Sequence, residues 1–124
     1  MARVEISQNK GPEVIKSWDG ATSATASDNY GPVVNVRNYT LHSYHVINHT
    51  GGSSVTFKII GSNYTDPSSG TASSNFTTHW TTISTHTITP GSSLAYSDIW
   101  NFKYACIHFT GSTAKVEVYE KHNA

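Results

Sequence analysis

The chain has 124 residues with eight basic and eight acidic side chains, so its formal net charge is zero. This length suits one domain with a core of its own. The neutral balance argues against a general nucleic-acid binder, which needs an excess of positive charge. Serine and threonine supply 33 residues, whereas leucine and methionine together supply three. Such a composition favours strands over helices.

The N-terminal quarter differs from the rest of the chain. Residues 19–29 are almost all small or polar, and the stretch ends at Gly31-Pro32. Ordering a backbone costs about 1–2 kcal/mol per residue, and so few large apolar side chains offset little of that cost. We therefore predict an extended arm over residues 1–32, with one or two short strands, followed by a β-sandwich domain over residues 33–124.

The body of the chain is a series of strand-like segments separated by turn signals. Val55, Phe57 and Ile59 alternate with polar residues, which is the pattern of a strand with one buried face. No segment keeps an apolar period of 3.6 residues. About seven to nine short strands with regular turns indicate an all-β fold, an antiparallel β-sandwich or jelly roll. The predicted strand segments are residues 33–36, 39–48, 54–59, 80–89, 100–109 and 114–119, with another strand starting at 94–96.

The last two of these segments predict a hairpin. Residues 100–109 and 114–119 both alternate, and Gly111-Ser112 lies between them. If they pair in one sheet, their apolar side chains share one face. The neighbours expected on that face are Ile107, Phe109, Val116 and Val118.

Histidine is a common metal ligand, and the chain contains seven. His42 and His45 are three residues apart, which puts them on opposite faces of a strand. His79 and His86 also have opposite parity. A single cysteine leaves none of the usual zinc spacings. We predict no metal site and no cofactor, and interpret the histidines as solvated or hydrogen-bonded residues of the sheets. The histidines compared in this way are His42, His45, His49, His79, His86 and His108.

No catalytic constellation is recognisable in the sequence, so we predict that the chain is not an enzyme. The eight carboxylates are scattered, and nothing marks the facing pair that a glycosidase needs. The nucleophile elbow, the phosphate-binding loop and the dinucleotide fingerprint are all missing from the sequence. Cys106 lies in an apolar run, and we interpret it as a small buried residue rather than a reactive thiol.

Two aromatic residues are predicted to bind a partner. Trp18 and Tyr30 fall in the weakly folding arm, where a large ring needs something to bury it. Tyrosine and tryptophan suit interfaces because each buries a large area and keeps a polar tip.

The C-terminal part of the chain holds three motifs in order: residues 79–83 (HWTTI), 88–98 (ITPGSSLAYSD) and 103–118 (KYACIHFTGSTAKVEV). A tryptophan strand, a Gly-Ser turn, an aromatic-led strand and a Thr-Gly turn follow one another. This pattern resembles small β-sandwich proteins of tailed bacteriophage particles, including capsid decoration (cement) proteins. That family usually has a basic residue in the penultimate strand, where this chain has Cys106 or His108.

The resemblance implies a non-enzymatic structural protein of the virion that binds and stabilises the assembled capsid. Its partners would be the major capsid protein or other virion proteins, it would be a homotrimer, and it would contact neither nucleic acid nor membrane. The arm could add a strand to an exposed sheet edge of a neighbour. The alternatives are a carbohydrate- or receptor-binding sandwich, since the region from Gly61 to Trp80 is faintly similar to discoidin-type domains, and another tail or head-closure component.

Overall fold

The computed structural model describes residues 15–18, 23–24, 29–64, 79–110 and 114–124, which contain ten strands. No helix within these ranges is long and apolar enough to cross a membrane. The strands are β1 (Ile15–Trp18), β2 (Ser23–Ala24), β3 (Asn29–Tyr30), β4 (Val34–Asn35), β5 (Leu41–Asn48), β6 (Val55–Ser62), β7 (Thr81–Ile88), β8 (Ser92–Ile99), β9 (Tyr104–Thr110) and β10 (Ala114–Asn123).

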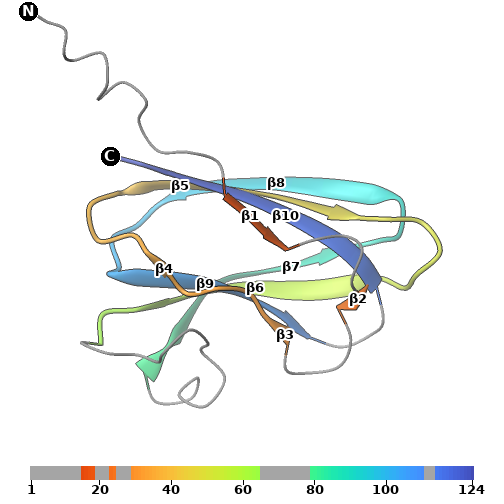
Figure 1. Ribbon diagram of the computed structural model, residues 1–124, viewed down its shortest axis with the longest axis horizontal. Coiled ribbons are helices and arrows are strands. Elements are labelled where there is room, and N and C mark those ends of the chain that lie inside the picture. Colours follow the sequence, from red (N-terminus) through yellow and green to blue (C-terminus); the bar gives the residue numbers. More distant parts are fainter. Residues whose placement is uncertain (1–14, 19–22, 25–28, 65–78, 111–113) are drawn as a thin grey trace, which may run out of the picture.

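Two antiparallel sheets pack face to face (Figure 1). One has the strand order β1-β10-β5-β8, and β2 also pairs with β10. The other has the order β3-β9-β6-β7, and β4 also pairs with β9. The chain changes sheet between β2 and β3, between β4 and β5, between β5 and β6, between β7 and β8, and at both steps from β8 to β10. Eight main strands wound in this way form a jelly roll, so the predicted all-β sandwich is confirmed.

The core between the sheets follows the two-residue alternation of the strands. Val55, Phe57 and Ile59 of β6 are buried, as predicted, while Thr56 and Lys58 lie on the other face. Burying a side chain of this size contributes about 1.5–3 kcal/mol. The core cluster consists of Tyr44, Val46, Val55, Phe57, Ile59, Ile88, Ile107, Phe109, Val116 and Val118.

The predicted C-terminal hairpin is wrong. β9 pairs with β6 in one sheet and β10 pairs with β5 in the other. Ile107 and Val118 belong to the same core cluster, but they enter it from opposite sheets. Alternation assigns each side chain to a face, yet it does not say which strand lies alongside.

Three short strands fall within the predicted N-terminal arm. β1 and β2 pair with β10, and β3 pairs with β9. The described parts of this segment therefore belong to the two sheets. Residues 1–14 lie outside the described residues, and the division of the chain at residue 32 stays a prediction.

A smaller apolar cluster lies on the outer face of the β3-β9-β6-β7 sheet. The pairing of β6 with β7 shifts between Ile59 and Ile60, as at a β-bulge. Ile59 belongs to the core, whereas Ile60 packs with Trp80 and Cys106 in the second cluster. Cys106 is buried, as predicted, and burial raises the pKa of its thiol to about 12.

Candidate functional site

Buried polar residues replace apolar ones at one end of the sandwich interior. The register of β5 against β10 places His42 opposite His122 and Tyr44 opposite Glu120. These four residues continue the inward-facing alternation of their strands. The exposed fraction is 0% for His42, 1% for Glu120 and 3% for His122, so these side chains are shielded from bulk solvent.

Glu120, His122 and His42 form one continuous hydrogen-bonded chain, whereas the buried hydroxyl of Tyr44 has no hydrogen-bond partner among the described residues. Glu120 Oε1 lies 2.8 Å from His122 Nε2, and His122 Nδ1 lies 2.8 Å from His42 Nδ1. His42 Nε2 lies 3.0 Å from the backbone carbonyl oxygen of Trp100. The Trp100 indole also stacks on the His42 ring, with ring centroids 3.5 Å apart. Both nitrogens of each imidazole are thus satisfied, as buried polar groups require.

Burial determines the charge of His42. Removal from water disfavours the imidazolium and lowers the pKa of His42, and His122 acts in the same direction. The Trp100 carbonyl, Asp98 and Glu120 oppose this shift without reversing it. This series of hydrogen bonds ends on the backbone carbonyl of Trp100 and not on a serine or cysteine side chain, so it lacks the nucleophile of a catalytic triad.

The remaining histidines are spread over both sheets. His45 is exposed while His42 is buried, which confirms that they face opposite sides of β5. His49 Nε2 lies 2.7 Å from Glu117 Oε2, and His79 stacks on Tyr64. Within the described part of the chain, no group of three or more histidine, cysteine or acidic side chains is arranged to hold a metal ion.

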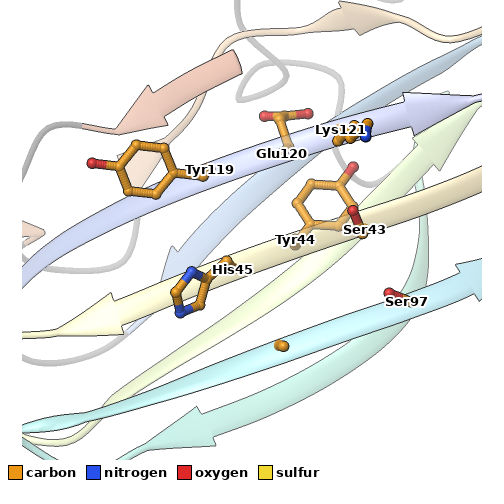
Figure 2. Close-up of a pocket in the computed structure, with 8 residues that line it drawn as sticks. Ser43, Tyr44, His45, Ser97, Tyr119, Glu120 and Lys121 are labelled. Atoms are coloured by element: carbon orange, nitrogen blue, oxygen red, sulfur yellow. The ribbon is translucent and has the colours of Figure 1, made fainter. Parts of the chain in front are cut away.

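A shallow hollow of about 450 Å³ lies over the middle strands of the β1-β10-β5-β8 sheet (Figure 2). Figure 2 shows that its lining comes from three neighbouring strands, β5, β8 and β10. The Tyr119 hydroxyl donates to Glu117 Oε1 at 2.6 Å, which restrains the ring. Its lining combines small residues with two tyrosines, one histidine, one glutamate and one lysine. Besides Tyr44 and Glu120, it is lined by Ser43, His45, Ala95, Ser97, Tyr119 and Lys121.

The two predicted partner-binding residues lie in different sheets. Trp18 is in β1, opposite Val118 of β10. Tyr30 is in β3; it is half-buried and stacks on His108, with ring centroids 3.9 Å apart. The structure does not bring Trp18 and Tyr30 together in one sheet. Their role in binding a partner stays a prediction.

The spacing of residues along a single strand does not predict the hydrogen bonds that connect Glu120, His122 and His42. A usable signal is present in β10, where Val116, Val118, Glu120 and His122 follow at two-residue steps and so share a face. The missing information is the register of β10 against β5. Residues about 80 positions apart meet there, and neither strand alone specifies that pairing.

The sequence matches no protein-family model and no curated protein. Similar solved structures include one from Bacillus endospore appendages, which form disulfide-linked pili: it is 14% identical, with 90% of this chain and 86% of that chain covered and a TM-score of 0.51. PirA is 9% identical, with coverages of 82% and 92% and a TM-score of 0.51. A mitogen from Yersinia pseudotuberculosis is 10% identical, with coverages of 89% and 86% and a TM-score of 0.41. At these identities the first two structures show a shared β-rich fold.

Proposed function

We propose that this chain is a non-enzymatic structural subunit of a virion, a decoration (cement) protein that binds and stabilises the assembled capsid. The observation that carries the proposal is a pair of open sheet edges. β7 and β8 are eight residues long, and each pairs with one strand only among the described residues. Such edges expose backbone groups that a neighbouring chain can pair with.

The composition of β7 supports this use of the edge. Monomeric proteins usually protect an edge strand with charged residues, proline or shortness. β7 contains neither proline nor any lysine, arginine, aspartate or glutamate. The zero net charge of the chain also removes long-range repulsion between copies. Many modest contacts on a repeating shell then add up through avidity.

One of the structural neighbours supports a role in a repeating assembly. The Bacillus endospore appendages form disulfide-linked pili. The single cysteine of this chain, Cys106, is buried, and its thiol donates a hydrogen bond to the Gly31 carbonyl oxygen at 3.2 Å. Copies of this chain would therefore associate through strands and side chains rather than through a disulfide.

A second candidate function is glycan binding by the hollow over β5, β8 and β10. The specific observation is that the Tyr119 ring, restrained by Glu117, lines the same hollow as the hydroxyls of Ser43 and Ser97. An aromatic face with nearby hydroxyl groups suits the apolar face and the hydroxyls of a sugar ring. In this alternative the chain binds a receptor carbohydrate and not a protein shell.

The test is binding of the purified chain to capsid shells that were assembled without it. We expect a homotrimer by light scattering and saturable co-sedimentation with the shells. A variant lacking residues 1–14 should bind much more weakly, since that segment would attach to the neighbour. The truncation stops before residue 15 because β1 pairs with β10.

A glycan array with the same protein separates the two functions. Shell binding without a glycan signal supports the decoration role. A glycan signal that disappears in Tyr119→Ala, with no shell binding, would replace it with the second candidate. Full shell occupancy by the truncated variant would show that residues 1–14 are not the attachment segment.

A further inference from the structure

The hydrogen bonds that connect Glu120, His122, His42 and the Trp100 carbonyl determine which ring nitrogens carry hydrogen atoms. The Trp100 carbonyl oxygen can only accept, so His42 Nε2 must carry the hydrogen of their 3.0 Å contact. A neutral imidazole has one N–H group. His42 Nδ1 is therefore an acceptor, and the hydrogen of the 2.8 Å contact between the two Nδ1 atoms belongs to His122.

The same reasoning fixes the proton count at Glu120. His122 Nε2 lies 2.8 Å from Glu120 Oε1. Either a protonated Glu120 donates to neutral His122, or a Glu120 carboxylate accepts from a charged His122. Both arrangements contain the same number of protons and have no net charge. A neutral whole is what deep burial favours, because an uncompensated charge there is costly.

One additional proton is incompatible with this arrangement. If His42 takes it up, the proton enters at Nδ1, the acceptor nitrogen of that ring. As long as His122 keeps its hydrogen on Nδ1, two N–H groups then face each other across 2.8 Å with no acceptor between them. If His122 is the charged partner of Glu120, two imidazolium rings would also repel each other. Protonation of His42 therefore either breaks the His42–His122 contact or forces His122 into its other tautomer, and in both cases it adds a positive charge to the buried network.

This contact lies where three strands of one sheet end. The backbone N–H of Thr40 donates to the Asn123 carbonyl at 2.9 Å, and the N–H of Trp100 donates to the Thr40 carbonyl at 3.0 Å. His42, near the start of β5, thus joins the end of β10 through His122 and the segment after β8 through Trp100. We propose that the Glu120–His122–His42–Trp100 chain is an acid-sensitive latch, which opens this end of the sandwich when His42 takes up one proton.

The groups packed around His42 do not prevent this opening. From β10, Glu120 favours the charged His42 and His122 disfavours it; from β8, Asp98 favours it. Asp98 is already bonded to the Tyr96 hydroxyl at 3.0 Å and to the Ile99 N–H at 2.8 Å.

Other titratable groups lie close by, on the inner face and in the outer cluster. Tyr44 contacts the His122 ring, and His86 of β7 contacts Tyr96. Cys106 of β9 is electrostatically coupled to Tyr44. Burial raises the pKa values of Tyr44, Tyr96 and Cys106, so these three groups stay neutral in acid.

The sign of the pH effect follows from the direction of the shift. Burial lowers the pKa of His42 below the ordinary 6.5. Below pH 6.5 the unfolded chain therefore binds a proton that the folded chain does not. The stabilisation is complete above the unfolded pKa and is lost as pH falls from there towards the folded pKa. One proton changes the unfolding constant by up to about tenfold per pH unit.

The test compares urea unfolding of the full chain and of His42→Gln between pH 7.5 and pH 5. Glutamine can donate to the Trp100 carbonyl and accept from His122, but it does not take up a proton. We expect the unfolding constant of the unmodified chain to rise by up to about tenfold more per pH unit than that of His42→Gln. His45→Gln is the matched control, since His45 is exposed on the same strand, and it should keep the original slope. Equal slopes for the unmodified chain and His42→Gln would overturn the proposal.

A measurement on the unmodified protein covers the case in which His42→Gln does not fold. Nitrogen-15 NMR distinguishes the two histidine tautomers directly. At pH 7 we expect His42 as the Nε2–H form and His122 with a hydrogen on Nδ1. On acidification, amide exchange should rise at residues 99–103 and 119–123 before it rises in β6. A Nδ1–H tautomer of neutral His42, or exchange that rises uniformly, would contradict the latch.

Discussion

Asn48 is a single buried residue that ties several segments together. It is fully buried at the end of β5, and its side-chain amide donates to the carbonyl oxygens of Ser53 and Ile88, each at 3.0 Å. Ile88 belongs to the opposite sheet. One amide group thus connects the β5–β6 turn with both layers of the sandwich.

Removing that amide should destabilise the fold. Asn48→Leu keeps a similar volume but leaves two carbonyl oxygens without their donor, so we expect a loss of about 1–3 kcal/mol in the free energy of unfolding. Chemical denaturation measures it. Ser93→Ala, at an exposed site of β8, is the control and should stay within about 0.5 kcal/mol. A loss no larger than in this control would show that the two bonds are dispensable.

For single residues, sequence patterns predicted the face of the strand on which a side chain lies but not the residues that it contacts. Phe57 was assigned to the core and His45 to the opposite face from His42, and both assignments are confirmed. The contact of His42 with His122 was not predictable from spacing. It depends on two strands far apart in the chain being adjacent and in one particular register.

At the scale of elements, β7 is the edge whose chemistry most favours association. Thr81 and Thr85 are exposed on it. A lysine on an edge strand opposes pairing with a second strand, because the charge would have to be buried or would face a like charge.

We therefore expect Thr81→Lys/Thr85→Lys to reduce the oligomeric mass measured by light scattering. The free energy of unfolding should change by less than about 1 kcal/mol, since surface substitutions have small effects. Thr50→Lys places one of these charges in an exposed turn instead of the edge strand and should leave the mass unchanged. An unchanged mass in the double variant would exclude β7 as the contact between copies.

The strands themselves were the most predictable elements. β5, β6 and β7 begin and end within a few residues of the segments that alternation and turn residues indicate. The hairpin of β9 and β10 was wrong because a short, turn-rich connection can join two strands of one sheet or cross to the facing sheet. Both choices bury the same side chains, so the pattern alone does not separate them.

At the scale of the whole molecule, the strands before residue 32 complete both layers. Tyr30 and Val33 pack against the outer cluster of Ile60, Trp80 and Cys106, and β1 lies beside β10. The fold class could be predicted from the composition and from the alternation of apolar and polar residues. The pairing of the short strands before residue 32 with both sheets could not, because that segment contains few large apolar residues. Backbone pairing with existing strands offsets part of the ordering cost that the side chains alone do not cover.

A variant lacking residues 1–32 should consequently be less stable than one lacking residues 1–14. Removing Tyr30 from the outer cluster and β1 from β10 should lower the free energy of unfolding by about 2–3 kcal/mol or more. Thermal unfolding followed by circular dichroism compares the two variants. Equal midpoints would mean that β1 and β3 contribute nothing to the stability of the sandwich.

The position of β10 has a consequence for how the protein is made. β10 follows every other strand along the chain, yet it lies between β1 and β5 in the middle of its sheet. During translation, β1 and β5 have no partner between them until residues 114–123 have left the ribosome. The nascent chain must therefore keep one layer unfinished, with apolar surface open to chaperones, until residues 114–123 are available for pairing.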